Sequence, residues 1–193
     1  MNSFLFRLLD FGIGLIGLCL TIPVMFFITL VYFFIGGKPF FFQSRLGQNQ
    51  VAFTIIKFRS MAPNTAAVRT HLANPEDVTI FGSLLRRTKL DELPQLINVL
   101  KGDMSLVGPR PGLPSDITLK DLRQEQGVFD VRPGITGLSQ IMGIDMSKPE
   151  LLARTDALMI EEMSVLNYFK YIILTILGAG GGDRINKCFR DIC

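Results

Sequence analysis

The feature that most restricts the fold of this chain is an uncharged apolar stretch near its N-terminus. From Phe11 to Gly37 the sequence contains no Asp, Glu, Lys or Arg. A helix of about 25 residues is long enough to cross the hydrocarbon core of a bilayer, so this stretch predicts a lipid-contacting helix. It is too long for a cleaved signal peptide and lacks a small-residue cleavage site. We therefore expect a membrane segment over residues 1–37 and a separate domain over residues 38–193.

Pro23 lies near the middle of this stretch and predicts a kink, because proline removes a backbone donor and clashes with the preceding turn. Thr21 is placed to satisfy a freed carbonyl. The residues alone leave two topologies open: a plain spanning helix, and a re-entrant helix–break–helix that enters and leaves by the same face. Positive charge on both sides, at Arg7 before the stretch and at Lys38 and Arg45 after it, does not select an orientation.

Composition favours one compact domain with a membrane-associated appendage. Of the 193 residues, 48% are hydrophobic and 19% charged, so some apolar surface is expected to face lipid. The mild basic excess, a formal net charge of +3, lies after residue 38 and fits an anionic membrane face or an anionic substrate. The chain has no Lys/Arg-rich run and no nucleic-acid-binding motif, so nucleic acid is not expected as a partner.

Cysteine and histidine exclude several kinds of site. Cys19, Cys188 and Cys193 are odd in number and lack metal-ligand spacing, which predicts a reducing compartment and no disulfide framework. His71 is the only histidine, so the chain offers no Ser/His/Asp or Cys/His catalytic set.

The rest of the chain predicts an α+β fold that is mostly helical. Phe40–Gln43 and Phe53–Phe58 are expected to form a small β-hairpin with Gly47–Asn49 as its turn; its aromatic side chains suit either the membrane interface or the core. Ser164–Leu177 is too short to span a bilayer and is expected to be an in-plane interfacial helix, with a buried core helix as the alternative. The remaining predicted helices are Ile80–Arg87, Pro94–Lys101 with a stop at Gly102, Lys120–Gln126, and an exposed Pro149–Met163. Loops are predicted at Pro63–Pro75, Gly108–Pro114 and Arg132–Gly137.

The segment Thr88–Pro111, TKLDELPQLINVLKGDMSLVGPRP, carries the residues most suited to chemistry. Asp91 and Glu92 are adjacent carboxylates near a predicted helix start, and a Gly/Pro/Arg loop follows that helix. Taken alone, Asp91 is most simply a helix cap. Surrounding cations suit a diphosphate instead, and an ionised carboxylate can coordinate Mg²⁺ or attack phosphorus. These cations are Lys57, Arg59, Arg86, Arg87, Lys89, Arg110 and Arg132.

Three motifs follow the apolar N-terminus in a fixed order: KFRSM, LRRTKLDELPQLINVLKGDMSLVGPRP and VRPGITGLSQ. Together they resemble the bacterial sugar transferase family, the monotopic phosphoglycosyl transferases that start glycoconjugate assembly. The likeness extends from about Phe11 to Gln140 and is greatest to the minimal catalytic form. It implies transfer of a phosphosugar from a UDP-sugar to polyprenol (undecaprenyl) phosphate, with release of UMP. The implied location is the cytoplasmic face of a bacterial inner membrane, and the implied product serves O-antigen, capsule, exopolysaccharide or glycoprotein glycan synthesis.

The resemblance also implies roles for individual residues. Asp91 would attack the β-phosphate and form a covalent phosphosugar–aspartate intermediate. Glu92 would handle the acceptor's proton or help hold the metal, and Mg²⁺ would bridge Asp91 and the diphosphate. Pro23 would mark the break of a re-entrant membrane helix, which favours that topology over a spanning helix. The positions implied in phosphate or nucleotide binding are Lys57, Arg59, Arg86, Arg110 with Pro111, and Arg132.

Two positions depart from the family pattern. Lys89 stands where a small polar residue commonly precedes Leu-Asp-Glu, and Ile144 stands where an Arg is common. These departures support an alternative, a catalytically inactive membrane-anchored scaffold derived from such an enzyme. A direct glycosyltransferase acting on protein, which would release UDP instead, is a third reading. An N-acetylated hexosamine is the expected sugar by analogy with small family members, and the oligomeric state is not predicted.

Overall fold

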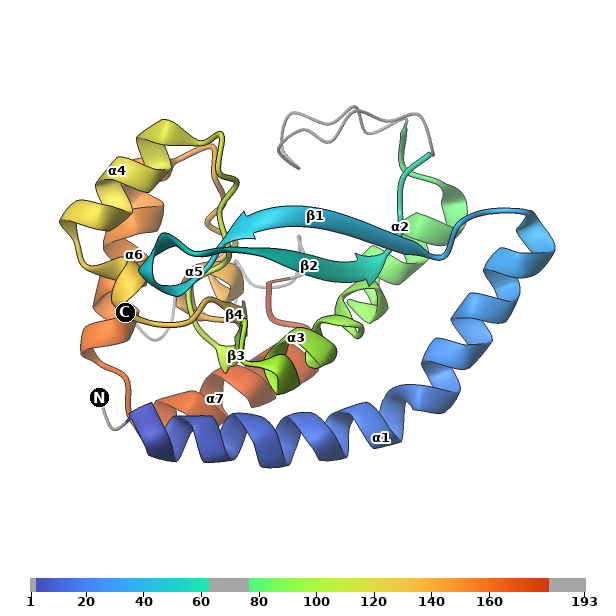
Figure 1. Cartoon of the computed structure of the whole chain (residues 1–193), viewed down its shortest axis with the longest axis horizontal. Coiled ribbons are helices and arrows are strands. Elements are labelled where there is room, and N and C mark those ends of the chain that lie inside the picture. The colour runs from blue at the N-terminus through green and yellow to red at the C-terminus, as the bar shows by residue number, and fades with distance from the viewer. Residues whose placement is uncertain (1–2, 63–76, 181–193) are drawn as a thin grey trace.

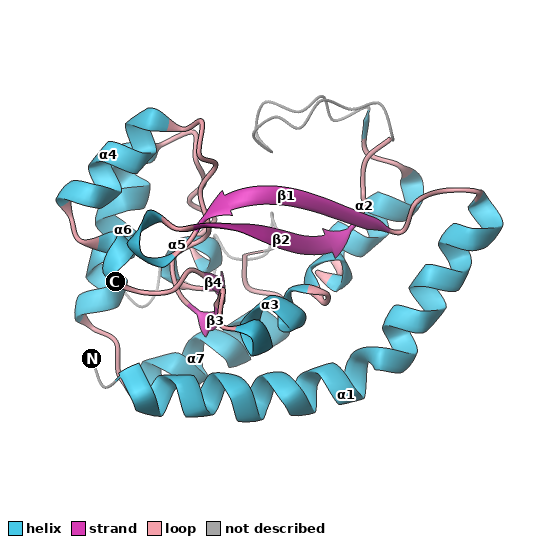
Figure 2. Cartoon of the chain, in the orientation of Figure 1, coloured by secondary structure: helices cyan, strands magenta, loops and turns pink. Residues whose placement is uncertain are grey.

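The computed structural model describes residues 3–62 and 77–180, arranged as a mostly helical α+β fold with two small sheets (Figures 1 and 2). The mostly helical α+β prediction is therefore confirmed. The loop predicted at Pro63–Pro75 lies outside the described residues, as do His71, Cys188 and Cys193.

The N-terminal helix α1 extends over Ser3–Ile35 and contains Pro23 without interruption. Its ribbon runs beneath the rest of the molecule and changes direction along its course (Figure 1). The Thr21 hydroxyl donates to the carbonyl of Gly17 at 2.7 Å. Proline at position 23 frees the carbonyl four residues earlier, that of Cys19, so Thr21 does not satisfy the carbonyl we expected. Its bond is instead a back-bond of the kind that bends helices.

Both ends of α1 contact the same folded domain. Near its start, the Arg7 guanidinium donates to the carbonyls of Val99 and Leu100 at 2.6 and 2.8 Å. Near its end, Ile28 and Tyr32 are buried together with residues of the hairpin and of helix α2 (Ile80–Arg87). The Tyr32 hydroxyl donates to the carbonyl of Arg59. Thus α1 is fastened to the domain at two separated points.

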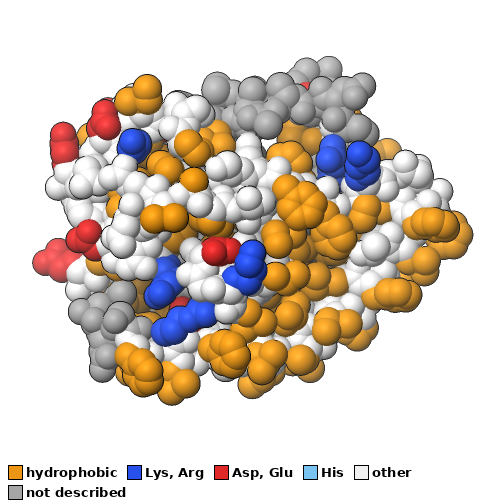
Figure 3. Space-filling view, in the orientation of Figure 1, with side chains coloured by type: hydrophobic (Ala, Val, Ile, Leu, Met, Phe, Trp, Pro, Cys, Tyr) orange, Lys and Arg blue, Asp and Glu red, His pale blue; other side chains and the backbone are white. Residues whose placement is uncertain are grey.

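The outer surface of α1 is apolar and exposed. Phe4, Leu20, Phe33 and Phe34 are each at least 73% exposed. Hydrophobic side chains dominate the lower edge of the molecule in Figure 3, where α1 runs in Figure 1. The helix is long and apolar enough to cross a bilayer by length and composition. These properties indicate association with a membrane.

The predicted hairpin is confirmed, with longer strands than expected. Strand β1, Phe40–Leu46, pairs antiparallel with β2, Ala52–Phe58, in the register Phe40↔Phe58. A short 3₁₀ helix, η1 (Gln48–Gln50), connects them. The aromatic side chains divide between the two expected environments: Phe40 stacks on the fully buried Phe58, whereas Phe42 is 60% exposed.

A second sheet was not predicted. Strand β3, Ser105–Val107, pairs in parallel with β4, Gly134–Thr136, inside the segment expected to be a loop. Each strand has only three residues, and β4 follows Arg-Pro within a Gly-rich stretch. Neither strand is therefore long enough to show the alternation of apolar and polar residues that marks a strand in the sequence. The loop prediction for Arg132–Gly137 is therefore wrong for Gly134–Thr136.

Five of the six shorter α-helices agree well with the predicted pattern, and the sixth, α5 (Leu138–Ile141), was not predicted. Gly102 ends the third helix in a left-handed conformation, φ 94°, as expected of a C-terminal glycine. The buried Asn98 of that helix joins it to β2, because its side chain accepts from the amide of Ile56 and donates to the carbonyl of Thr54. The observed bounds are α2 Ile80–Arg87, α3 Gln95–Lys101, α4 Ile117–Glu125, α5 Leu138–Ile141, α6 Pro149–Glu161 and α7 Val165–Ile176.

Two helix environments differ from expectation. Helix α6 is not simply exposed, because Leu152, Ala153 and Met159 are buried on its inner face. Helix α7 combines the two alternatives: Tyr168 and Tyr171 join the main core, whereas Leu166, Ile173 and Ile176 are exposed. An apolar helix can pack one face on the core and present the other to lipid.

Candidate active site

The two carboxylates of the Asp91–Glu92 pair lie in a single 3₁₀ turn, η4 (Leu90–Glu92), between α2 and α3. Lys89 precedes this turn with a left-handed backbone, φ 57°, which redirects the chain after α2. Helix α3 begins at Gln95 after Pro94, with no side-chain capping bond. The simple helix-cap interpretation of Asp91 is therefore wrong.

The pair opens into a cleft of about 500 Å³, a size typical of ligand sites. Strands, helices and loops distant in sequence form its walls. Of the predicted site residues, the cleft brings together both carboxylates and the three cations Lys57, Arg86 and Arg110. The charged residues that line it are Arg45, Lys57, Arg86, Lys89, Asp91, Glu92, Arg110 and Asp145. The rest of the wall includes Thr136, Gln140, Ile144, Met146, Leu152 and Thr175.

Asp91 is only 8% exposed, yet no side chain or amide in the described part of the chain donates a hydrogen bond to its carboxylate. Burial, followed by the negative charge of Glu92, raises its pKa to about 6. Lys57, Arg86 and Arg110 oppose this shift. A desolvated carboxylate near cations is a common arrangement for a reactive group.

Three cations approach the pair from different elements. Arg110 Nη2 lies 3.4 Å from Glu92 Oε1. Arg86, in the last turn of α2, donates from Nε to the Ser60 hydroxyl at 2.7 Å. Burial, followed by repulsion from Arg110 and Arg45, lowers the pKa of Lys57 to about 8. Mutually repelling cations concentrated in one cleft favour binding of a polyanion.

Arg45 is a cleft residue that the sequence interpretation did not assign to the site. It is 7% exposed, donates to the carbonyl of Pro111 at 3.2 Å and to Gln43 at 2.6 Å. Burial, followed by repulsion from Arg110, lowers its pKa to about 10. The hairpin register offered a signal: Arg45 opposes Phe53 and Lys57 opposes Phe41, so both cations project from one face of the hairpin.

Two of the predicted cations lie elsewhere. The Arg59 guanidinium lies over the ring of Phe41, 5.9 Å from its centroid. Arg132 donates from Nε to the carbonyl of Gly102 at 2.9 Å. Neither lines the cleft, while Pro111 lines a small adjoining hollow with Arg45 and Lys57.

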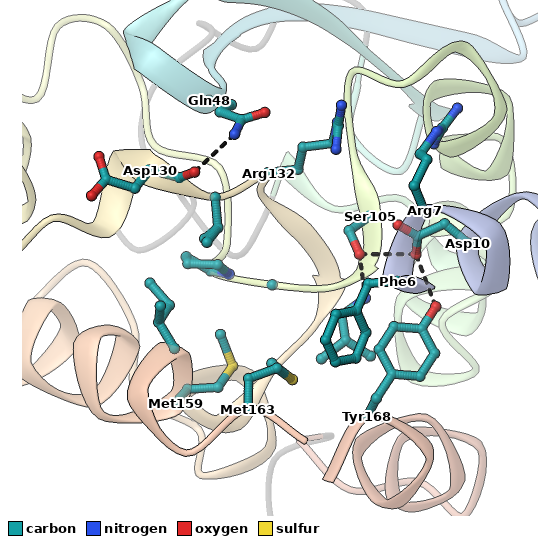
Figure 4. Close-up of a pocket in the computed structure, with 15 residues that line it drawn as sticks. Phe6, Arg7, Asp10, Gln48, Ser105, Asp130, Arg132, Met159, Met163 and Tyr168 are labelled. Carbon is teal, nitrogen blue, oxygen red and sulfur yellow. Dashed lines mark hydrogen bonds between the residues drawn. The ribbon is translucent and has the colours of Figure 1, made fainter. Parts of the chain in front are cut away.

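Arg132 lines a second pocket (Figure 4), to which Gly108 and Pro109 also contribute. Its apolar side is formed by Phe6, Met159 and Met163, and Asp10 lies beside it with dashed bonds to neighbouring side chains. This pocket lies next to the start of α1 and contains neither carboxylate of the Asp91–Glu92 pair.

Lys89 also contributes to the cleft. Its ammonium group donates to the carbonyl of Ala179, just after α7. Gly180 packs against the backbone of Gln140, where a Cβ would lie 2.3 Å from the carbonyl oxygen. Lys89 thus places a cation where the segment after α7 meets the turn carrying the two carboxylates.

A divalent cation is compatible with the pair but would not be enclosed by protein. No group of three or more His, Cys, Asp or Glu residues gathers as a metal site within the residues the structure describes. Asp91 and Glu92 can supply carboxylate oxygens, the ligands that Mg²⁺ prefers, while substrate phosphates and water would supply the remainder.

Sequence comparisons identify the family of the chain. The family model described as "Bacterial sugar transferase" matches residues 1–180. The chain is 38% identical over 171 residues to the uncharacterized sugar transferase EpsL of Bacillus subtilis, covering 88% of this chain and 84% of that protein. It is 35% identical over 192 residues to the galactosyl transferase CpsE of Streptococcus agalactiae, covering 90% of this chain but 42% of the relative. It is 35% identical over 159 residues to the undecaprenyl-phosphate galactose phosphotransferase of Salmonella typhimurium, covering 74% of this chain and 33% of the relative.

Proposed function

The chain belongs to the bacterial sugar transferase family, and from this premise we propose that it is a phosphoglycosyl transferase acting at a membrane surface. The donor is a UDP-sugar and the acceptor is polyprenol phosphate. The products are UMP and a polyprenyl-diphospho-sugar, the first membrane intermediate of a surface polysaccharide or other glycoconjugate. Two relatives whose names specify a galactosyl or galactose phosphotransferase activity support this reaction class.

The observation that carries the proposal is the state of Asp91. Its carboxylate is buried, has no hydrogen-bond donor among the described residues, and lies in a cleft with five basic side chains from separate segments of the chain. An unsolvated carboxylate retains its nucleophilicity, and the surrounding cations offset the repulsion between it and a diphosphate.

The reaction has two displacements. An ionised Asp91 oxygen attacks the β-phosphorus, the bond from that phosphorus to the bridging oxygen breaks, and UMP leaves with that oxygen. An oxygen of polyprenol phosphate then attacks the same phosphorus, and the Asp91 carboxylate is released. Where the acceptor phosphate arrives with a proton, Glu92 is placed to take it.

The basic residues have separate tasks in this scheme. Lys57 and Arg86 lie close enough to influence the charge of Asp91 and hold phosphate oxygens at the attacked phosphorus. Arg110 lies beside Glu92 and neutralises charge on the diphosphate. Arg59 and Arg132 lie outside the cleft and have no task in this scheme, whereas the carbonyl of Pro111 orients Arg45. Bound Mg²⁺, held by Asp91 with Glu92, would supply charge neutralisation and orientation of the diphosphate.

We further propose that α1 is re-entrant, with the bend at Pro23, in a bacterial inner membrane and with the catalytic domain on the cytoplasmic face. The support is that Arg7 and Tyr32, near opposite ends of α1, both bond to the same domain. A spanning helix would carry one end to the opposite face of the bilayer, away from that domain. Single cysteines at Ser3 and Lys38, in a background without native cysteines, should be labelled from the same side; labelling from opposite sides would refute this topology.

The activity is tested by incubating the protein with a panel of UDP-sugars, Mg²⁺ and polyprenol phosphate, with released nucleotide identified. UMP supports the proposal, UDP supports direct glycosyl transfer, and no release across the panel supports an inactive scaffold. Asp91→Asn should abolish UMP release and the phosphosugar adduct seen by intact-protein mass spectrometry. Asp121→Asn, which changes an exposed acid on α4, is the matched control and should retain both. Turnover by Asp91→Asn would exclude Asp91 as the nucleophile.

A further inference from the structure

The loop that carries Arg110 is held through five consecutive backbone carbonyls, from Gly108 to Gly112. Two of these residues are prolines, so the loop has few amide donors with which to form regular structure. The donors come from elsewhere: Gln140 Nε2 to residue 108 at 3.2 Å, the Gly134 amide to residue 109 at 2.9 Å, Arg123 Nη1 to residue 110 at 2.8 Å, Arg45 Nη1 to residue 111 at 3.2 Å, and the Leu46 amide to residue 112 at 3.0 Å.

The bond to Arg110 comes from a buried ion pair. Arg123 in α4 places Nη2 2.5 Å from Asp156 Oδ2 in α6, and the two side chains are 3% and 0% exposed. The hydroxyl of Ser139 in α5 donates to the other Asp156 oxygen at 2.7 Å. One face of the Arg123 fork is therefore fixed by Asp156, while its other terminal nitrogen is aimed at the Arg110 carbonyl.

A buried ion pair contributes little net stability to a protein core. Removing two charges from water can cost more than their attraction returns, and apolar replacements are often equally stable. Arg123 Nε is also buried without a partner among the described residues. The two terminal nitrogens of Arg123, by contrast, both make short, direct contacts. These contacts hold the guanidinium between Asp156 and the carbonyl of Arg110.

We infer that Arg123, held by Asp156, is a positioning residue that directs Arg110 toward Glu92 and the diphosphate. Neither member of the buried pair lines the catalytic cleft. Arg110 has a fixed carbonyl but a side chain that is 41% exposed and reaches Glu92. Fixing the backbone of a long side chain lowers the cost of ordering its charged end on a substrate. The identity of the substrate in this inference rests on the proposed function, whereas the fixing of the Arg110 backbone by Arg123 does not.

The key variant is Arg123→Lys, which keeps a cation beside Asp156 but lacks the planar fork needed to reach Asp156 and the Arg110 carbonyl together. UDP with Mg²⁺ is the binding probe, because its affinity can be measured without turnover. We expect affinity to fall roughly 10- to 100-fold, the scale of a misplaced binding group. Arg154→Lys, on the exposed face of α6, is the matched control and should bind UDP as the wild type does.

A double-mutant cycle separates positioning from general damage. In an Arg110→Ala background, Arg123→Lys should cause no further loss of UDP affinity, because the side chain it directs is absent. An equal loss in both backgrounds would overturn the inference, as would wild-type affinity of the single variant. Asp156→Asn, which keeps the side-chain volume, should reproduce the same dependence on Arg110.

Hydrogen exchange tests the inference without a substrate. Arg123→Lys should increase exchange at the amides of the non-proline residues in 108–113 and leave α3 protected, whereas Arg154→Lys should change neither. Unchanged exchange in that loop would overturn the inference. If the wild type neither binds UDP nor releases UMP, the proposed function fails, and the exchange result still decides whether Arg123 fixes the loop.

Discussion

Asp10, in the membrane-associated helix α1, accepts a hydrogen bond of 2.8 Å from the hydroxyl of Tyr168 in α7. The same carboxylate oxygen accepts from the Ser105 hydroxyl at 2.9 Å and the Leu106 amide at 2.8 Å, both in β3. Asp10 is 2% exposed, so these bonds form in the interior. A single charged side chain in an apolar helix thereby joins the membrane-associated helix to the sheet that leads into the Arg110 loop.

We expect Asp10→Ala to destabilise the fold by about 3–5 kcal/mol, because it leaves three buried donors without an acceptor. Asp10→Asn keeps an acceptor without the charge and should cost less, while Tyr168→Phe removes one donor and should cost about 1 kcal/mol. Thermal unfolding in detergent measures the series. Membrane association should persist in all three variants, because the apolar surface of α1 is unchanged. Equal stability of Asp10→Ala and the wild type would show that these bonds contribute nothing.

The pH dependence of kcat/KM should be bell-shaped. Asp91 must be ionised to attack, and burial followed by Glu92 raises its pKa to about 6, so activity should rise as the pH increases through about 6. Lys57 must be charged to hold phosphate, and burial followed by Arg110 and Arg45 lowers its pKa to about 8, so activity should fall above about 8. Initial rates of UMP release across pH measure both limbs.

Two changes should move the acidic limb in a defined direction. Glu92→Gln removes the neighbouring negative charge and should lower the pKa of Asp91, shifting the limb to lower pH. Higher Mg²⁺ concentration should shift it the same way, because metal and proton compete for the carboxylate. An acidic limb that stays fixed under both changes would show that Asp91 does not control it.

The same pKa shift means that ionised Asp91 lowers the free energy of unfolding. A carboxyl whose folded-state pKa is raised contributes stability that is full below the unfolded value of 3.8 and is lost as pH rises through about 6. Asn cannot ionise, so Asp91→Asn should be more stable than the wild type by roughly 2–3 kcal/mol near pH 7, and the difference should vanish near pH 4. Urea unfolding in the presence of EDTA measures it. A less stable variant at neutral pH would contradict the buried, unpaired state of this carboxylate.

Elements with strong local signals were predictable from sequence. Helix α2 begins after Thr79, whose side chain caps it, and its predicted bounds are those observed. The hairpin was found because Phe40–Gln43 and Phe53–Phe58 flank a Gly-containing turn. Strands β3 and β4 were not found, because pairs of three-residue strands are held by contacts made only after folding. Local pattern cannot report such tertiary pairing.

The sequence predicted the chemistry of the site better than it predicted which basic residues line the cleft. Asp91 and Glu92 were found through adjacency and the motif around them, and the cleft contains both. Arg132 sits in a Pro/Gly loop like Arg110, yet β4 begins just after it and directs it to the carbonyl of Gly102. Arg45 was missed because an isolated arginine in a strand carries no local signal. Which of the similar cations reach the carboxylates depends on strand register and loop path.

Gly134 should tolerate no side chain, because β4 meets the Arg110 loop there backbone against backbone. A Cβ at this position would lie 2.0 Å from the amide nitrogen of Gly108 and 2.6 Å from its Cα. Both glycines also carry bonds of the junction: the Gly108 amide donates to the carbonyl of Thr136 at 2.8 Å, and the Gly134 amide donates to that of Pro109 at 2.9 Å. Gly134→Ala must therefore separate β3 from β4 and displace the loop.

We expect Gly134→Ala to lower stability by about 1–3 kcal/mol or more, as overpacking does, and UMP release by about tenfold or more as Arg110 moves. Gly12→Ala is the matched control, since nothing lies within 4 Å of its added Cβ. Because alanine favours helix over glycine, this control should be stabilised by about 0.5–1 kcal/mol and remain active. Unfolding in detergent and UMP release measure both variants. Wild-type stability and activity in Gly134→Ala would mean that the close approach of these two backbones does not position the loop.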